Sequence, residues 1–118
     1  SEDMDESESI RRYNKTIKTI HRYIKQHLQE DISLTTLAEQ VYLNPVYLSR
    51  IYKQLTGQKL SNYITRERIE RAKTLLAEPQ YKINEIGYQV GYESPAHFSR
   101  AFKKTVGLTP AEYRESLL

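Results

Sequence analysis

Two short stretches of the chain carry a hydroxyl, a guanidinium and an ammonium group at the same spacing. An arginine guanidinium can donate a pair of hydrogen bonds to guanine, and a small hydroxyl can contact a phosphate or a base edge. A lysine ammonium binds phosphate and fixes register without reading sequence. This chemistry suits the noncovalent recognition of a nucleic acid. The residues are Ser49, Arg50 and Lys53 and, fifty positions later, Ser99, Arg100 and Lys103.

The first set lies on the longer helix of a predicted helix-turn-helix unit. Ser33 can cap a short helix that runs to about Val41. Asn44-Pro45 then starts a second helix, with proline at the first helical position, where its missing N–H costs nothing. Gly57 lies where a left-handed C-cap is expected. The predicted buried stripe of the second helix is Leu48, Ile51, Tyr52 and Leu55.

The second set lies in a copy of the same unit. Residues recur 49 positions later before the turn and 50 positions later after it, so the length difference is confined to the turn. Ser94-Pro95 repeats the helix start, Gly107 repeats the helix stop, and the turn Gly91-Tyr92-Glu93 contains the glycine common in such turns. The predicted buried stripe is Phe98, Ala101, Phe102 and Val106.

Three further helices are predicted around these units. Apolar residues at helical spacing indicate a first helix over roughly residues 11–29. A second covers Ser61 to Ala77 and stops before Pro79, because the residue preceding proline disfavours helix. Thr109 and Glu112 form a capping box that opens a closing helix.

These elements predict an all-α fold with seven helices, arranged as two helix-turn-helix lobes joined by a central linker helix. No segment is typical of a strand. The predicted division is an acidic tail or linker at residues 1–10, a first lobe at 11–61, a central helix at 62–78 and a second lobe at 79–118.

The net charge of +3 understates the basic character of the predicted lobes. Residues 1–9 carry five acidic side chains, and the rest of the chain holds all 18 Lys and Arg against ten acids. Such a basic body favours a polyanionic partner, because each neutralised phosphate releases counterions. The acidic start is interpreted as a disordered tail or an interdomain linker. An extra segment introduced for protein expression is an equally weighted alternative.

The composition argues against several other classes of protein. With 38% apolar residues in 118, a large interior substrate cavity is not expected. The chain has no cysteine, no signal-peptide pattern and no apolar run of membrane-spanning length, which favours a cytoplasmic location and no membrane partner. Its three histidines are scattered, and no phosphate-binding glycine loop is present. We therefore predict no enzyme activity, catalytic residue, metal or cofactor.

The face of each second helix that the core stripe leaves free is the predicted reading surface. Valine and alanine on this face can touch a thymine methyl group. The alternative for each charged residue is that it lies on a solvated helix face and binds nothing. A second alternative for Arg50 or Arg100 is an ion pair with an acid of a neighbouring helix. Candidate base-reading residues are Val46, Tyr47, Ser49, Arg50, Ala96, His97, Ser99 and Arg100. Candidate phosphate-binding lysines are Lys53, Lys103 and Lys104.

Several motifs in these segments resemble one family of regulators. Residues 91–104 (GYESPAHFSRAFKK) and 107–114 (GLTPAEYR) closely resemble the signature of AraC-type transcription regulators. Residues 43–50 (LNPVYLSR) and 68–76 (RIERAKTLL) look like the family's first recognition helix and central helix. The resemblance covers about residues 15–118 and agrees in motif order and spacing.

The resemblance implies a sequence-specific, double-stranded DNA-binding domain of a bacterial activator or repressor. Its two recognition helices would enter successive major-groove segments. The residues that match the family's base-reading positions are Val46, Ser49, Arg50, Ala96, His97, Ser99 and Arg100. Ser33 would add a phosphate contact at the start of the first short helix. Lys82 departs from the polar cap that many members have at the corresponding position, which puts that contact in doubt in the second unit.

The resemblance also implies partners beyond DNA. Family members usually carry a companion domain for ligand sensing, dimerisation or phosphoryl reception, and we expect one on the N-terminal side. The acidic start is similar to response regulators of two-component systems. RNA polymerase is a candidate partner. Because Val46 and Ala96, and Tyr47 and His97, differ between the units, we expect an asymmetric target.

Ten tyrosines leave a second type of module open, one that stacks unpaired RNA bases or binds protein. Most of them fall at or beside predicted buried stripes, so core packing explains them better. The members of that group are Tyr23, Tyr52, Tyr63, Tyr88 and Tyr113, whereas Tyr42 and Tyr47 are less certain.

Overall fold

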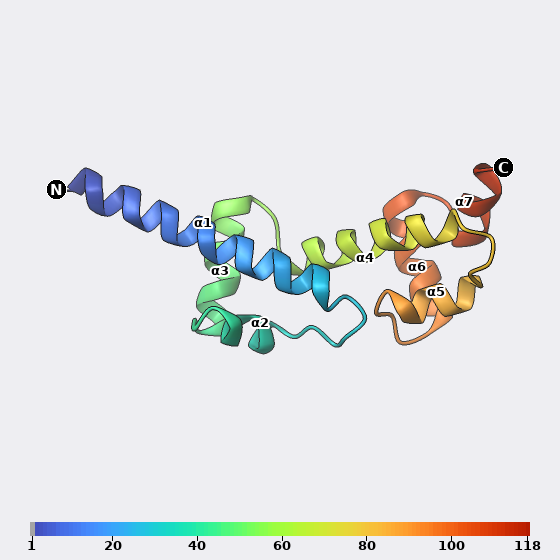
Figure 1. Ribbon diagram of the computed structural model, residues 1–118, viewed down its shortest axis with the longest axis horizontal. Coiled ribbons are helices and arrows are strands. Elements are labelled where there is room, and N and C mark those ends of the chain that lie inside the picture. The colour runs from blue at the N-terminus through green and yellow to red at the C-terminus, as the bar shows by residue number, and fades with distance from the viewer. Residues whose placement is uncertain (1) are drawn as a thin grey trace. The chain divides into compact units, whose positions relative to one another are not determined.

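The computed structural model describes residues 2–118, with side chains from residue 5 onward, and these form seven α-helices and no strand (Figure 1). The all-α prediction is therefore confirmed for the described residues. Contacts divide the described chain into two units, the first made of residues up to 27 and 32–60 and the second of residues 28–31 and 61–118. The helices are α1 Glu2–Gln26, α2 Leu34–Gln40, α3 Pro45–Thr56, α4 Leu60–Leu76, α5 Ile83–Gln89, α6 Pro95–Val106 and α7 Pro110–Ser116.

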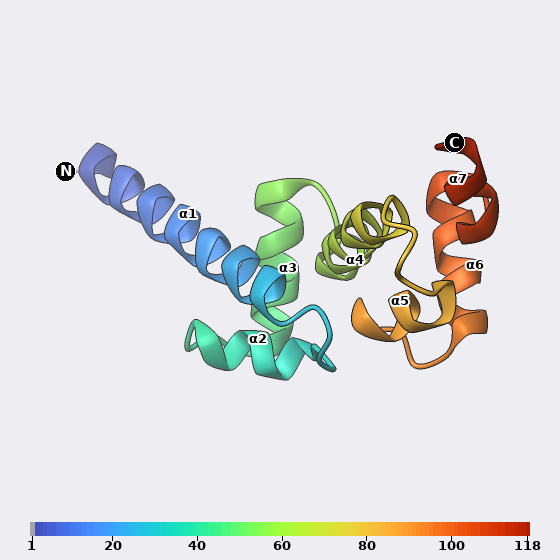
Figure 2. The same cartoon turned by 45° about the vertical axis from the view of Figure 1, so that its right-hand side comes forward.

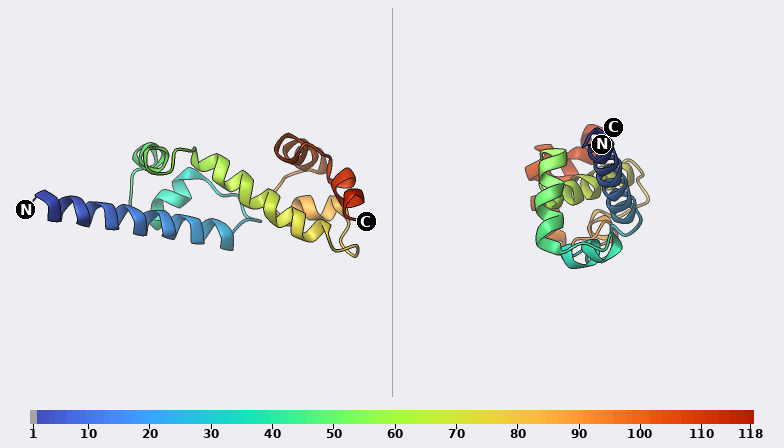
Figure 3. Two further views of the ribbon diagram at one scale, coloured as in Figure 1. Left: turned by 90° about the horizontal axis from the view of Figure 1, so that it is seen from above. Right: turned by 90° about the vertical axis from the view of Figure 1, so that its left-hand side faces the viewer.

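Helix α1 begins much earlier than the sequence pattern indicated. It starts at Glu2 and not near residue 11, so that its N-terminal turns extend beyond α2 and α3 as one continuous rod (Figure 3). Residues 2–10, expected as a disordered tail or linker, thus continue the helix. Their use as a connection to another domain stays a prediction.

The first unit buries one face of each of its helices in a common core. Ser33 caps α2 by accepting a hydrogen bond from the Thr36 amide, at 3.0 Å. Asn44 caps α3 through two amides, and Gly57 ends α3 in the left-handed conformation. Leu55 was expected in the buried stripe of α3, but it lies in the last turn and is 44% exposed. The buried residues are Ile20, Ile24, Leu37, Ala38, Leu48, Ile51, Tyr52 and Leu60.

The second unit repeats this arrangement with an aromatic core. Helices α5 and α6 are joined by a tight turn, as are α2 and α3 in the first unit (Figure 2). Ser94 caps α6, Gly107 ends it, and the capping box of Thr109 and Glu112 opens α7, as the sequence predicted. Four rings follow one another at centroid distances of 5.5–5.8 Å: Tyr92, Phe98, Phe102 and Tyr113.

Two arginines of the second unit hold main-chain carbonyl groups. Arg68 of α4 donates to the carbonyl oxygens of Leu28 and Glu30, at 3.2 and 3.0 Å. Arg114 of α7 donates to the carbonyl oxygen of Leu76 at 2.9 Å, and more weakly to that of Glu78. Leu76 is the last residue of α4, so its carbonyl accepts no hydrogen bond within the helix, and the other three carbonyls lie in the segments that follow α1 and α4. We refer to these two contacts as the carbonyl clasps.

Gly91, in the turn before α6, lets the main chain pass close to the contact between Arg68 and Leu28. Its φ is +106°, in the region that favours glycine. A Cβ atom at this position would collide with the carbonyl oxygen of Leu28 and with the guanidinium of Arg68. The corresponding residue of the first unit is Tyr42, which also has a positive φ, of 56°, and is 95% exposed.

Candidate nucleic-acid interface

Helix α3 presents the predicted reading face of the first unit to the surface. Leu48, Ile51 and Tyr52 point into the core, so the positions between them are left outside. Val46 is apolar, yet it is 73% exposed. At this position its side chain contributes little to the packing of the domain. The structure places these residues together on the exposed side of α3: Val46, Ser49, Arg50 and Lys53.

Tyr47 of α3 is held by two neighbours. Its hydroxyl lies 3.4 Å from the hydroxyl of Tyr13 on α1, a long hydrogen bond in which either group can donate. The guanidinium carbon of Arg50 lies 5.8 Å from the centre of the Tyr47 ring. The hydrogen bond to Tyr13 raises the pKa of Tyr47, helped by partial desolvation. The sequence pattern of the first helix gave no sign of this contact between Tyr13 and Tyr47.

Helix α6 presents the corresponding face of the second unit. Ser99 is half-buried, whereas the other predicted residues of this face are exposed. The ring of His97 packs edge-on against Tyr92, with centroids 5.2 Å apart and planes at 76°. The exposed residues are Ala96, His97, Arg100, Lys103 and Lys104.

A groove of about 480 Å³ lies between α4 and α6 in the second unit. Its lining joins two candidate base readers and one candidate phosphate-binding lysine to polar side chains of α4 that sequence reasoning missed. The spacing of Asn62 and Thr65 on α4 gave no sign of this role, because it depends on how α4 packs on α6. The lining residues are Asn62, Thr65, His97, Arg100, Ala101, Lys104 and Thr105.

Neither Arg50 nor Arg100 forms an ion pair with an acidic side chain among the residues that the structure describes. The alternative in which these arginines pair with an acid of a neighbouring helix is therefore not observed. Lys103 lies close enough to Glu112 to contribute to lowering the pKa of that carboxyl, although the hydrogen bonds from Thr109 contribute more. Lys103 thus has an intramolecular electrostatic partner, whereas no such interaction is seen for Lys53 or Lys104 within the part of the chain that the structure describes.

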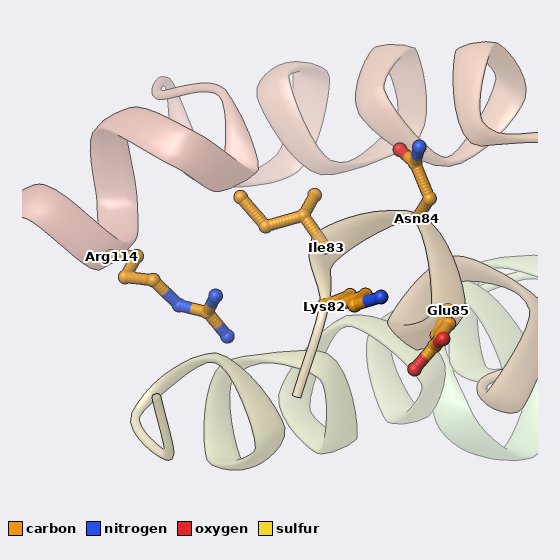
Figure 4. A pocket seen from close by; sticks show the side chains of 5 residues that line it. All are labelled: Lys82, Ile83, Asn84, Glu85 and Arg114. Carbon is orange, nitrogen blue, oxygen red and sulfur yellow. The ribbon is translucent and has the colours of Figure 1, made fainter. Parts of the chain in front are cut away.

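The two short helices begin differently. Ser33 at the start of α2 is exposed, and its hydroxyl is already engaged by the amide and the hydroxyl of Thr36. Lys82 takes the same place before α5 and makes no side-chain cap. It lines a pocket of about 510 Å³ with Ile83, Asn84, Glu85 and Arg114, in which Arg114 reaches across from α7 (Figure 4). Lys82, which departs from the family's polar cap at this position, therefore leaves α5 without a side-chain cap.

The tyrosines divide between core and surface. Tyr52 and Tyr63 are buried, and Tyr23 and Tyr113 are partly buried, as expected. Tyr88, which was expected beside a buried stripe, is 51% exposed, because α5 turns its other face to the core through Ile86 and Gly87.

In the described part of the chain, no three acidic or histidine side chains gather as metal ligands would. No described helix combines the length and apolarity that crossing a membrane requires.

Fold and site together define an all-α protein with two helix-turn-helix units, each of which exposes a basic face on its longer helix. Residues 37–116 match the model of a family described as a helix-turn-helix domain. The chain belongs to this family, in the form found in AraC-type regulators. The family comprises DNA-binding domains of transcription regulators and not enzymes.

Individual relatives agree with this assignment. The chain is 30% identical over 105 residues to the regulatory protein PocR of Salmonella typhimurium, covering 89% of this chain and 35% of PocR. The C-terminal domain of AraT, a response regulator from Geobacillus stearothermophilus, has a TM-score of 0.81 and 37% identity, covering 86% of this chain and 84% of that domain. The DNA-binding domain of AdpA, solved in complex with a target DNA, has a TM-score of 0.77 and 27% identity, with coverages of 82% and 87%. The chain spans about a third or less of the length of the first curated relatives that it matches.

Proposed function

We propose that this domain binds double-stranded DNA sequence-specifically, with α3 and α6 as its recognition helices in successive major-groove segments. The observation that carries the proposal is the pair of exposed faces on α3 and α6, each following a tight turn and each holding an arginine without an acidic partner among the described residues. Arginine in this setting is the commonest specific reader of guanine. The complex of the AdpA domain with its target DNA supports the proposal.

The exposed residues divide by reach and chemistry. Arg50, Arg100 and the residues around them lie on the first two turns of their helices, which is where a recognition helix meets base edges. Lys53 and Lys104 lie further along and bind phosphate in this proposal, with Lys103 and the hydroxyl of Ser33 in the same role. Asn62 and Thr65 of α4 extend this surface beside α6.

The two recognition helices read different sequences in this proposal. Val46 and Tyr47 of α3 correspond to Ala96 and His97 of α6, and these pairs differ in size and hydrogen-bonding capacity. A single chain would then bind a directional site without dimerising.

The proposal extends to the surrounding protein. The relatives are longer than this chain, and AraT is a response regulator, so we propose a companion sensing, dimerisation or receiver domain on the N-terminal side. RNA polymerase is the proposed further partner in an activator. Both roles place the protein in the cytoplasm, where bacterial DNA is transcribed.

Selection of bound sequences from a random duplex library tests the proposal. We expect an asymmetric site with two half-sites about 10–10.5 bp apart. Arg50→Ala and Arg100→Ala should each cost about 1–3 kcal/mol and relax the preference at one base position. Arg71→Ala, on an exposed position of α4, is the control and should leave the preferences unchanged. Equal affinity for single-stranded RNA and duplex DNA, or a footprint on a single groove segment, would contradict the proposal.

A further inference from the structure

Three side chains of the first unit make successive contacts that lead from α1 to the exposed face of α3. The hydroxyl of Tyr13 lies 3.4 Å from that of Tyr47, and the Arg50 guanidinium carbon lies 5.8 Å from the centre of the Tyr47 ring. We propose that Tyr13 and Tyr47 are positioning residues that hold Arg50 in the orientation in which it reads a base. The inference rests on the proposed function and assigns Tyr47 a role other than base reading.

The first step of the argument concerns the Tyr47 hydroxyl. A phenol has a single O–H donor, and the contact with Tyr13 uses either this donor or a lone pair of the oxygen. Where Tyr47 is the donor, a base acceptor would have to compete with Tyr13 for its single hydrogen. The partly buried ring is also held between two neighbours, on α1 and α3, whereas Val46 beside it is 73% exposed. Tyr47 is therefore better placed to support a neighbour than to reach into a groove.

The second step concerns the freedom of Arg50. A long exposed side chain populates many rotamers, and binding must select one of them at an entropic cost. A guanidinium within about 6 Å of a tyrosine centroid is attracted to the face of the ring. The geometry of Arg50 and Tyr47 meets this limit, so the ring restricts the guanidinium before DNA arrives. Tyr13 in turn restricts the ring.

The second unit lacks this device and so supplies an internal comparison. His97 occupies the position of Tyr47, and its ring packs edge-on against Tyr92. Among the described residues, Arg100 has no aromatic ring beneath its guanidinium, and it lines the groove beside α4. The preference that depends on Arg100 should therefore be insensitive to changes at Tyr13 and Tyr47.

The experiment measures base preference at each position of the selected duplex for the variants Tyr13→Phe, Tyr47→Phe, Tyr47→Leu and Arg50→Ala. The position flattened by Arg50→Ala identifies the base that Arg50 reads. At that position we expect Tyr47→Leu to reduce discrimination about two- to five-fold, the range of an exposed cation–π contact. Tyr13→Phe and Tyr47→Phe, which remove only the long hydrogen bond, should each reduce it about two-fold. In the Arg50→Ala background, none of these changes should have a further effect at this position.

Tyr23→Phe is the matched control, because Tyr23 lies on the same helix and stacks on His27. Tyr23→Phe should leave the base discrimination unchanged at every position of the duplex. Circular dichroism with urea unfolding verifies that each variant folds. Should Tyr47→Leu fail to fold, Tyr13→Phe still carries the test.

Two results overturn the inference and leave the proposed function standing. One is unchanged discrimination at the Arg50 position in Tyr13→Phe and Tyr47→Leu. The other is a change at a different base position in Tyr47→Leu, which would make Tyr47 a base reader. Absence of any preference at all in the wild-type domain would instead contradict the proposed function itself, and the inference with it.

Discussion

The guanidinium of Arg68 donates its Nε hydrogen to the carbonyl oxygen of Leu28, at 3.2 Å, from a half-buried position against the ring of Tyr92. Burial lowers the pKa of Arg68 below its usual value, while nearby Tyr92 and Asp31 oppose the shift. The charge remains on the guanidinium at neutral pH. A partly desolvated cation is thus compensated by main-chain carbonyls, which favours this packing over any in which the arginine lacks them.

Replacing Arg68 should destabilise the domain. Arg68→Ala leaves the Leu28 and Glu30 carbonyls without this donor, and hydrogen bonds to charged groups contribute about 1.5–3 kcal/mol. We expect a loss of that order in the free energy of unfolding, measured by urea denaturation. Arg68→Lys should recover only part of it, because an ammonium cannot donate to both carbonyls in the planar geometry of a guanidinium. A loss no larger than that of Arg71→Ala would contradict the carbonyl clasp.

Two glycines with similar backbone conformations should respond differently to alanine. Gly107 has φ of +91° with open space around its Cβ position, so Gly107→Ala should cost about 1 kcal/mol from the backbone alone. Gly91 has φ of +106°, and a Cβ there meets the Leu28 carbonyl and the Arg68 guanidinium. Gly91→Ala should therefore cost at least about twice as much in the same urea experiment. Equal losses would show that the chain relaxes around Gly91.

A missing cap offers a route to stabilisation. Lys82 has the extended backbone of an N-cap residue and makes no side-chain cap, whereas Ser33 and Ser94 cap their helices. Lys82→Ser should raise the free energy of unfolding by about 1 kcal/mol. Ser94→Ala is the counterpart and should lower it by about the same amount. No gain in Lys82→Ser would mean that the serine hydroxyl does not reach an amide of α5.

The capping box of α7 should make stability depend on pH. The backbone and side-chain hydrogen bonds from Thr109 lower the pKa of Glu112 in the folded state, so its contribution is present above the unfolded pKa of about 4.3. That contribution is lost as the pH falls through the lowered folded pKa. Glu112→Gln keeps an acceptor without the charge, so the advantage of the wild type over it should shrink between pH 6 and pH 3. Glu115→Gln, on the same helix, should show no such convergence.

Phosphate contacts should appear in the salt dependence of DNA affinity. If Lys104 binds one phosphate, Lys104→Ala should reduce the slope of log K against log salt by about 0.9 and weaken binding alike on all sequences. Lys73, which pairs with Glu70 at 3.3 Å, is the control, and Lys73→Ala should leave the slope unchanged. A loss for Lys104→Ala that is confined to one target sequence would make Lys104 a base reader.

Much of the fold could be predicted because its signals are local. Ser33, Asn44, Ser94 and Thr109 each bond to an amide two or three residues away, so the sequence around them suffices to place a helix start. The start of α1 was missed because acidic helix formers resemble a solvated tail in composition. Leu55 and Tyr88 were misplaced because periodicity indicates the side of a helix but not how far the neighbouring elements cover it.

The candidate site was predictable to a similar degree. Once the core stripes of α3 and α6 are known, the exposed faces with Arg50 and Arg100 follow by elimination. The contact of Tyr13 with Tyr47 and the presence of Thr65 beside α6 depend on how separate helices pack. No spacing within one segment encodes such contacts, and sequence reasoning accordingly missed both.

In the carbonyl clasps the arginines bind main-chain oxygens, so these hydrogen bonds depend on the path of the main chain and not on the type of the accepting residue. Every residue type offers a carbonyl oxygen, so substitutions at an exposed position such as Glu30 leave the acceptor of Arg68 in place. The same holds for Glu78 and Arg114. Substitutions at the exposed acceptors Glu30 and Glu78 therefore keep the carbonyl clasps, provided that Arg68, Arg114 and Gly91 are retained, whereas packing still constrains the buried Leu28 and Leu76.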